Sequence, residues 1–394
     1  MTEVSWWQAR VLAGEAMGGS SGEEVPLADA LGRTLASDAV ALTDLPGFPT
    51  AAMDGWVVCG SGPWTIVGTI DTGASSVVHL DAGEAMRIGT GGAVPVGATA
   101  VIPFEAATVT DSRVNADVTD RTHIRVQGEE CVVGDVLAHR GDVINPALMG
   151  SLSAAGIDDV AVIRRPLISV LILGDEVIRS GVPTTGQVRD ALGVQLPGWI
   201  HLLGGDVVSV RTCTDDPQEL ADALRSSSGE ADMTVVTGGT ARGHRDFLRS
   251  TLEALDATMI VDGVAVRPGH PMMLATLDGT PVVGLPGNPL SALVATVTLI
   301  QPSFDAWFSR AERDLPKVAM AEGVVPSSRP LTRLMVGRRE LGGFRQVERV
   351  SSAMLRGIAH ADGWAVVPPE GVHAHEAVLW IPVPWMRRTG ETGE

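Results

Sequence analysis

Carboxylate side chains follow three segments of the chain that have the composition of buried β-strands. Glu176 comes shortly after the apolar run 167–173, and Asp215 comes shortly after the run 206–211. Asp246 lies beyond the glycine-rich turn that ends the third segment. Carboxylates beside such a turn would repel a phosphate group unless a divalent cation bridged them, and Mg²⁺ prefers oxygen ligands of this kind. We therefore expect these three acids to hold Mg²⁺ next to an anionic ligand.

Two glycine-rich turns follow expected strands and have the composition of an anion-binding site. Glycine lets backbone N–H groups approach an anion, and the start of a following helix adds partial positive charge. Neither turn has the Gly-Lys-Ser/Thr ending of a Walker A loop or the G-x-G-x-x-G spacing of a Rossmann loop, which disfavours an ordinary ATPase or a nicotinamide dehydrogenase. The expected ligand-binding residues are Gly238, Gly239, Gly243, Pro286, Gly287, Asn288, Pro289 and Ser291.

A short turn, 266–271, holds an arginine and a histidine in a segment that also contains two prolines and a glycine. Arginine pairs with phosphate and other oxyanions through two parallel hydrogen bonds. Arg267, with His270 beside it, is therefore a candidate oxyanion-binding residue. The alternative is a surface turn with a solvated arginine, and the neighbouring acids and glycine turns favour the first interpretation.

The alternation of strand-like and helix-like segments from 166 to 308 predicts how these residues are positioned. The expected strands are 167–173, 206–211, 233–237 and 281–283, and the expected helices are 191–203, 217–226, 246–255 and 290–308. Strands that alternate with helices form a doubly wound parallel sheet with helices on both faces. In such a sheet ligands bind beyond the carboxyl ends of the strands, where the acids and the glycine turns would lie.

The segments on either side of this region have a different pattern. Residues 4–18 carry apolar side chains at helical spacing. From about 25 to 165, turn residues separate short β-rich runs, which predicts small β-sheets or barrels. These runs are 56–59, 65–70, 100–103 and 123–126. Short strands return after Pro316, at 331–336, 365–367 and 377–381, so a small C-terminal β-domain is expected.

Composition narrows the class of protein further. The chain has 394 residues, of which 45% are hydrophobic and 19% charged, as in a folded protein of several domains. A formal net charge of −18 without a long basic run argues against binding to nucleic acid or to an anionic membrane. No apolar run reaches membrane-spanning length and no signal-peptide pattern is present, so we expect a cytoplasmic protein. Cys59, Cys131 and Cys213 are too far apart for a C-x-x-C zinc site.

Six segments, in order along the chain, resemble the motifs of the molybdopterin molybdenumtransferase family, whose members include bacterial MoeA and the E domain of gephyrin. The family patterns are P-x-F-x-x-S-x-M-D-G-Y-A, R-I-x-T-G-A-x-x-P-x-G-A-D, T-G-D-E-L, T-G-G-V-S-x-G-x-x-D, K-P-G-K-P and L-P-G-N-P-x-S. Their counterparts begin at residues 46, 87, 173, 237, 267 and 285. The runs 52–55 and 285–291 are the most specific of them.

The resemblance implies a multidomain α/β plus β fold. Its central part is a doubly wound parallel-sheet domain similar to MoaB and Mog proteins, flanked by two N-terminal β-rich modules and a C-terminal β-barrel. The implied domains are an N-terminal helix packing on the α/β domain (1–20), an elongated β-rich linking domain (21–50 and 136–165), a small β-barrel-like domain (51–135), the α/β molybdopterin-binding domain (166–312) and the C-terminal β-barrel (313–394).

The resemblance also implies an activity, the Mg²⁺-dependent insertion of molybdate into adenylylated molybdopterin with release of AMP. Family members are homodimers whose active site combines the α/β domain of one subunit with β-rich modules of the other. A molybdopterin adenylyltransferase is the upstream partner that this reaction implies. Neither nucleic acid nor a membrane is expected as a partner.

Residue by residue, the resemblance assigns roles to positions that match the family motifs. The catalytic residues would be Asp54, Thr90, Glu176, Asp215, Asp246 and Arg267, with Glu176, Asp215 and Asp246 around the metal. The glycine turns, His270 and Ser352 would bind substrate. Without the resemblance, the segments around Asp54 and Thr90 are interpreted only as turns.

Some motif positions carry other residues than the family pattern. Ala51 replaces the serine of the first motif, Thr240 begins a run that replaces Val-Ser-x, and Asp190-Ala191-Leu192 replaces a D-S-N run. These changes leave two alternatives open, a non-catalytic molybdopterin-binding or scaffolding paralogue of the same fold and a molybdopterin adenylyltransferase. The β-rich motifs argue against the adenylyltransferase, because that reaction would not need them.

Overall fold

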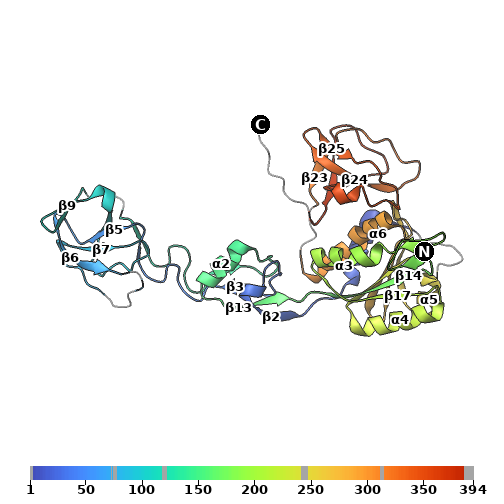
Figure 1. The fold of residues 1–394 in the computed structure, drawn as a ribbon, viewed down its shortest axis with the longest axis horizontal. Helices are drawn as coiled ribbons and strands as arrows, with labels where there is room; N and C mark the ends of the chain where they lie inside the picture. The colour runs from blue at the N-terminus through green and yellow to red at the C-terminus, as the bar shows by residue number, and fades with distance from the viewer. Residues whose placement is uncertain are drawn as a thin grey trace. The chain divides into compact units, whose positions relative to one another are not determined.

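The computed structural model describes residues 3–71, 73, 78–117, 122–240, 247–310 and 315–385. The chain forms two compact units (Figure 1). The α/β unit comprises Met1–Ser21 and Arg164–Glu394, and the β-rich unit comprises Gly22–Ile163.

A six-stranded sheet forms the centre of the α/β unit. In spatial order its strands are β17 (Asp206–Cys213), β14 (Leu167–Leu173), β18 (Met233–Thr237), β22 (Thr280–Leu285), β21 (Met273–Leu277) and β19 (Thr258–Asp262). The first four strands are mutually parallel, as the sequence predicts.

The last two strands, β21 and β19, are not among the strands expected from the sequence, and β21 runs antiparallel to both of its neighbours, β22 and β19. β21 and β22 are joined by Asp278 and Gly279, both of which have positive φ (50° and 83°). An Asp-Gly pair in this conformation is a hairpin turn, and it reverses the chain direction within two residues. The Asp278-Gly279 pair was therefore the available signal for β21.

Helices cover both faces of the sheet, which confirms the doubly wound arrangement (Figure 1). They are α3 (Leu192–Leu203), α4 (Pro217–Glu230), α5 (Leu248–Ala254) and α6 (Pro289–Ala295), the last continuing through a π-helical segment (Thr296–Ile300) into α7 (Gln301–Trp307). In Figure 1, α4 and α5 lie below the sheet, and α3 and α6 lie above it. Below the sheet, Leu171 and Val236 pack against Leu220 of α4 and Leu248 of α5.

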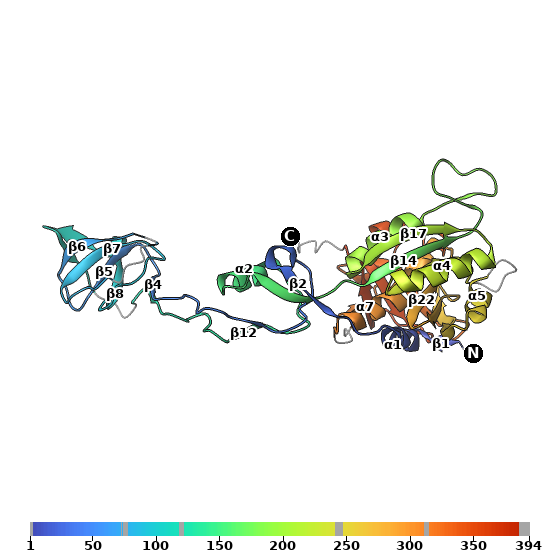
Figure 2. The ribbon, with the colours of Figure 1, turned by 90° about the horizontal axis from the view of Figure 1, so that it is seen from below.

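The N-terminal helix α1 (Trp6–Ala16) belongs to the α/β unit. The indole N–H of Trp6 donates to Oγ1 of Thr298 (3.0 Å), and Oγ of Ser303 donates to the carbonyl of Ala13 (2.8 Å). These contacts hold α1 against the helical segment that follows β22, although most of the chain separates the two in sequence (Figure 2).

The C-terminal strands close into a small barrel, as the resemblance implies. They are β23 (Lys317–Ala319), β24 (Thr332–Glu340), β25 (Gly343–Gln346), β26 (Gly363–Val367) and β27 (Ala377–Pro382). They pair in the order β25-β24-β26-β27-β23, and Met320, just after β23, bridges to Phe344 in β25. That bridge completes the ring of strands. Phe344 and Trp380 pack edge to face, with ring centroids 5.4 Å apart.

Two regions of the β-rich unit contain most of its buried hydrophobic clusters. One belongs to a six-stranded sheet whose strands, in spatial order, are β8 (Ala100–Pro103), β5 (Gly55–Val58), β7 (Glu84–Ile88), β6 (Trp64–Ile70), β10 (Arg113–Asn115) and β9 (Thr108–Thr110). The other lies under α2 (Pro146–Ala154) and includes the buried Leu35, Leu152 and Val162. Three strand pairs complete the unit: β2 (Gly22–Pro26) with β13 (Asp159–Ile163), β3 (Ala39–Val40) with β12 (Val136–Ala138), and β4 (Thr50–Ala51) with β11 (Ile124–Arg125).

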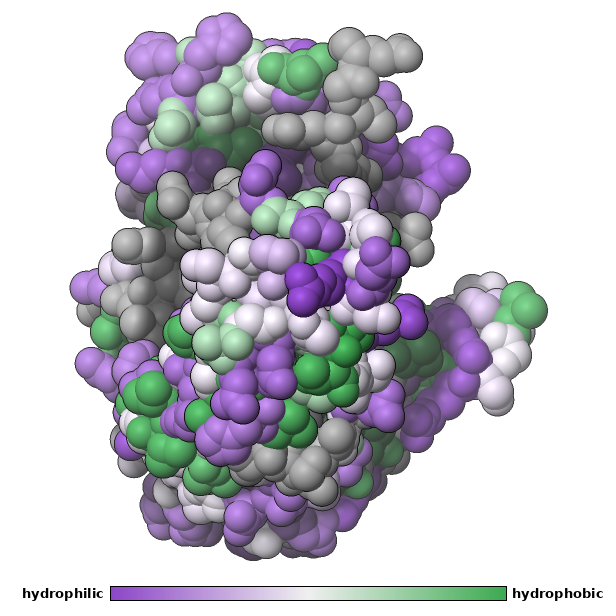
Figure 3. Space-filling view, turned by 90° about the vertical axis from the view of Figure 1, so that its left-hand side faces the viewer, coloured by the Kyte–Doolittle hydropathy of each residue, from purple (hydrophilic) through white to green (hydrophobic). Residues whose placement is uncertain are grey.

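Exposed hydrophobic side chains are scattered. On the face shown in Figure 3 they form small groups separated by hydrophilic residues. Leu42 and Val133 are examples in the β-rich unit. Within the described ranges, no helix has both the length and the apolar character needed to cross a membrane.

Candidate functional site

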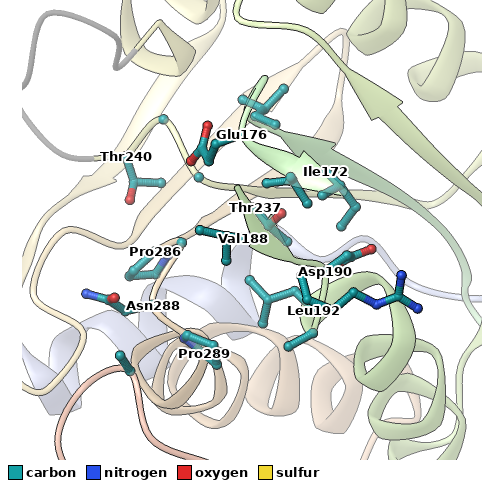
Figure 4. Close-up of a pocket in the computed structure, with 18 of the residues that line it drawn as sticks. Ile172, Glu176, Val188, Asp190, Leu192, Thr237, Thr240, Pro286, Asn288 and Pro289 are labelled. Carbon is teal, nitrogen blue, oxygen red and sulfur yellow. The ribbon is translucent and has the colours of Figure 1, made fainter. Parts of the chain in front are cut away.

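A cavity of about 760 Å³ opens at the carboxyl ends of β14, β18 and β22 (Figure 4). Ile172 and Thr237 line it from the strand ends, Leu192 from the start of α3, and Leu355 from the segment that precedes β26. This is the edge of a doubly wound sheet at which ligands bind. The structure therefore has a cavity where the sequence predicts one.

The two glycine turns come together at this cavity. The N–H of Gly238 donates to the carbonyl of Leu285 (2.9 Å), which ties the first turn to the end of β22. Gly238 and Gly239 both have positive φ (85° and 64°), a conformation that residues with a Cβ rarely adopt. No described residue accepts a hydrogen bond from the N–H of Gly239 or Thr240. Within the described part of the chain, these two donors are therefore left for an anion. Gly243 lies outside the described residues.

The turn before α6 differs from the first glycine turn in how its backbone N–H groups are used. Pro286, Gly287, Asn288 and Pro289 line the cavity, as expected. The N–H groups of Leu290 and Ser291, however, both donate to the carbonyl of Ser352 (2.9 and 3.2 Å). These first amides of α6 are therefore satisfied within the protein and are not available to a ligand. Ser291 is itself buried, and Ser352 caps the helix through its backbone.

The three expected metal ligands are not grouped in the described part of the chain. Glu176 lines the cavity, and its side chain folds back over Gly174, where an added Cβ would lie 2.8 Å from Oε2. Asp215 is not among the lining residues, and its N–H donates to Oδ1 of Asp175 (3.2 Å). Asp246 lies outside the described residues. Among the residues that are described, no three His, Cys, Asp or Glu side chains are arranged to hold a metal ion.

Asp190 is a cavity residue that the sequence did not single out. Its side chain is 7% exposed, and its Oδ1 accepts a hydrogen bond from the N–H of Gly193 (2.7 Å) in the first turn of α3. A Cβ at Gly193 would lie 2.3 Å from Oδ2, so the glycine permits this close cap. The available signal was an aspartate three residues before a glycine at an expected helix start.

Arg189 is the one basic side chain among the described residues that line the cavity. The expected bases Arg267 and His270 are not among these residues. Arg267 ends β20 (Val264–Arg267), which pairs in parallel with β24. The Nδ1 atom of His270 lies 2.9 Å from the carbonyl of Val264 and 3.1 Å from Oε1 of Glu3. The histidine is thus engaged near the start of α1, and only Pro271 of this turn reaches the cavity.

Asp54 and Thr90 meet in the β-rich unit. β5 and β7 are antiparallel, with Gly55 opposite Ile88, so the residue before one strand and the residues after the other lie at the same end of the sheet. Both the N–H (2.6 Å) and the hydroxyl (2.7 Å) of Thr90 donate to Oδ1 of Asp54. These hydrogen bonds, with a smaller contribution from the charge of Arg87, hold the pKa of Asp54 below its usual value.

The chain combines a glycine-lined cavity at the carboxyl edge of a doubly wound sheet with a β-rich unit and a closed barrel, and this combination defines a class of protein. It is that of multidomain α/β proteins whose α/β domain takes up a small anionic ligand.

Comparison with known proteins identifies the family. Residues 4–156 match the family model described as the MoeA N-terminal region (domain I and II), and residues 169–306 match the model of a probable molybdopterin binding domain. Molybdopterin molybdenumtransferase 2 of Mycobacterium tuberculosis is 30% identical over 369 residues, which cover 88% of this chain and 91% of that protein. The chain belongs to the molybdopterin molybdenumtransferase family, as its six motifs predict.

Two further relatives agree with this assignment. A molybdopterin molybdenumtransferase of Staphylococcus aureus is 27% identical over 258 residues, or 62% of this chain and 60% of that protein. A crystal structure of a molybdopterin biosynthesis MoeA protein from Pyrococcus horikoshii has a TM-score of 0.81 and 26% identity, covering 97% of this chain and 99% of that one. The multidomain α/β plus β fold is therefore that of known MoeA structures.

Proposed function

We propose that this chain is a molybdopterin molybdenumtransferase, which inserts molybdate into adenylylated molybdopterin and releases AMP. The observation that carries the proposal is the cavity at the carboxyl ends of β14, β18 and β22, with the N–H donors of Gly239 and Thr240 beside it. The activity named for the Mycobacterium tuberculosis relative, which this chain matches over 91% of its length, supports the proposal.

The lining of the cavity suits such a substrate. Molybdate and the pyrophosphate linkage are both anionic, and preorganised N–H groups stabilise negative charge where it develops during reaction. Ile172, Val188 and Leu192 supply apolar surface against which a flat pterin ring can pack. Holding both substrates in one cavity also removes much of the entropic cost of bringing them together.

We propose that Mg²⁺ binds with the substrate at Glu176. Magnesium sites commonly use one or two carboxylates together with substrate phosphates. The carboxylate of Glu176 lies at the cavity and has no hydrogen-bond partner among the described residues, so it fits this role. Asp215 and Asp246 remain the other candidates from the sequence. The ion would neutralise the repulsion between these acids and the phosphate oxygens.

We also propose that the active enzyme is a homodimer in which the Asp54–Thr90 pair of one subunit completes the cavity of the other. The family resemblance implies this arrangement, and a twofold dimer is the commonest oligomer. The pair supports the proposal because it presents an exposed carboxylate that is held in its ionised form. A molybdopterin adenylyltransferase would supply the adenylylated substrate.

Release of AMP by the purified protein tests the proposed activity. With adenylylated molybdopterin, Mg²⁺ and molybdate, we expect release that depends on molybdate. E176Q should lower kcat/KM by about tenfold or more, equivalent to ~1.4 kcal/mol of transition-state stabilisation. Glu253 is an exposed acid of α5 that does not line the cavity, so E253Q is the matched control. Ligand binding without molybdate-dependent release would overturn the proposal.

A further inference from the structure

Among the described residues that line the cavity, one side chain is a cation. Glu176, Asp190 and Arg189 are the ionisable side chains among the described residues that line it. Neither base of the 266–271 turn is part of this lining, and the first amides of α6 are satisfied by the Ser352 carbonyl. A ligand with phosphate or molybdate oxygens therefore meets a single guanidinium in this part of the structure.

The backbone around Arg189 is fixed in place. Arg189 ends β16 (Val188–Arg189), which pairs in parallel with β15 (Val177–Ile178). The N–H of Asp190 donates to the carbonyl of Ile178 (2.9 Å), and the buried carboxylate of Asp190 accepts from the N–H of Gly193 in the first turn of α3. Figure 4 shows the side chain of Asp190 at the cavity. The backbone of Arg189 is therefore held in a wall of the cavity by hydrogen bonds on either side of it.

The side chain of Arg189 is exposed, and no described residue forms an ion pair or a hydrogen bond with it. Arg179, Arg267 and Arg356 are likewise without a side-chain partner among the described residues, whereas several other arginines of this unit are paired. Arg164 lies 2.6 Å from Oδ1 of Asp232, and Arg211 lies 2.8 Å from Oε2 of Glu230. An unpaired guanidinium at a cavity wall presents the flat fork of N–H donors that matches an oxyanion.

We propose that Arg189 binds a tetrahedral oxyanion of the substrate, either a phosphate group of adenylylated molybdopterin or molybdate itself. This inference rests on the proposed function and assigns to Arg189 the anion-binding role that the sequence predicts for Arg267. The α/β unit thereby supplies both kinds of donor, the backbone N–H groups of the Gly238–Thr240 turn and a side-chain guanidinium.

The test compares R189A and R189K with R179A. Arg179 follows β15, is exposed and does not line the cavity, so R179A is the matched control. Calorimetric titrations with AMP and with molybdate measure binding, and steady-state assays give kcat and the KM of each substrate. Thermal unfolding of each variant shows whether it is folded.

We expect R189A to weaken binding of the relevant anion by roughly ten- to a hundredfold, as for loss of a charge-assisted hydrogen-bond pair. If R189A weakens AMP binding and raises the KM of adenylylated molybdopterin, the ligand of Arg189 is the phosphate group. If R189A weakens only molybdate binding, the ligand is molybdate. R189K should recover part of the lost affinity, because lysine keeps the positive charge but lacks the planar set of N–H donors of arginine. R179A should behave as the wild-type protein.

Wild-type affinities for both AMP and molybdate in a folded R189A variant would overturn the inference, as would equal effects in R189A and R179A. Failure of the proposed function is a separate outcome. It would be shown by the absence of molybdate-dependent AMP release in the wild-type protein, and the two titrations would still decide whether Arg189 binds an oxyanion.

Discussion

The hydrogen bonds from Thr90 stabilise the ionised form of the Asp54 carboxyl group. The two residues are 36 positions apart, and each lies in a segment whose composition indicates only a turn. Their hydrogen bonds favour the ionised carboxylate, which lowers the pKa of Asp54. Since the folded pKa lies below the unfolded one, the stabilisation is present above the unfolded pKa and is lost as the pH falls through the folded pKa.

Removal of the Thr90 hydroxyl should reverse part of this effect. In T90A we expect the pKa of Asp54 to rise toward its usual value, because the side-chain hydrogen bond is the largest cause of the lowering. The acidic limb of the kcat/KM profile should move to higher pH with it. Carbon NMR titration of the Asp54 carboxyl measures the shift directly. T110A, on the exposed strand β9, is the control, and an unaltered Asp54 titration in T90A would contradict the assignment.

At the scale of elements, the cavity depends on how β18 ends and how α3 begins. The turn after β18 passes through positive φ at Gly238 and Gly239, and α3 is capped by the carboxylate of Asp190. The glycine turn and the Asp190–Gly193 hydrogen bond each involve residues close in sequence. Together they position lining residues on two sides of the cavity. Changes to the turn and to the cap should therefore be measurable as changes in stability.

Substitution of Gly238 by alanine should destabilise the protein. A φ of 85° costs a residue with a Cβ about 1–2 kcal/mol, and the new Cβ would lie 3.3 Å from the carbonyl oxygen of Leu173. Urea denaturation of G238A measures the change. In α4, an added Cβ at Gly229 meets no atom within 4 Å, so G229A should instead stabilise the protein by about 0.5–1 kcal/mol. Equal stability of the two variants would contradict this account of the turn.

The hydrogen bond from the Gly193 N–H to Asp190, at the start of α3, leads to a second prediction about stability. D190A removes the acceptor for the Gly193 N–H and should lower the free energy of unfolding by about 1 kcal/mol. D190N keeps an oxygen in the same place and should retain most of the stability. Denaturation curves for the two variants provide the comparison. A D190N variant as unstable as D190A would show that the negative charge, and not the hydrogen bond, holds the helix start.

At the scale of the whole molecule, the functional groups are divided between the two units of the chain. The glycine turns, Glu176 and Arg189 belong to the α/β unit, and the Asp54–Thr90 pair belongs to the β-rich unit. The proposed homodimer assigns these two groups to one active site built from two subunits. Mixing two inactive variants can test that proposal directly.

Subunits carrying D54A should complement subunits carrying E176A. In a twofold dimer with composite sites, random mixing gives heterodimers with one intact site, so about a quarter of the wild-type activity should return. Each variant alone should be inactive, and the mixture must be unfolded and refolded, or coexpressed, to exchange subunits. No recovery in verified heterodimers would show that both residues act within a single subunit.

Much of the fold was predictable, because it depends on local patterns. Fully buried strands are short continuous apolar runs, and apolar side chains of amphipathic helices repeat with a period of 3.6 residues. The expected strand 167–173 coincides with β14. The antiparallel strands β19 and β21 were missed, although the Asp278-Gly279 hairpin turn was a local signal for one of their connections. The expected helix 290–308 is interrupted by a π-helical segment, which apolar periodicity does not distinguish from an α-helix.

The sequence by itself determined the strand-end position of the cavity, the glycine turns beside it and the membership of the family, because these follow from local composition and motif order. Only the tertiary structure decided which charged groups face the cavity. Arg267 and Arg189 have the same chemistry, but Arg267 ends a strand paired with β24, whereas Arg189 lies in the cavity wall. Likewise, the amides of α6 were expected to be open to a ligand until the Ser352 carbonyl, distant in sequence, proved to occupy them. Such outcomes depend on contacts between remote segments, which no local pattern specifies.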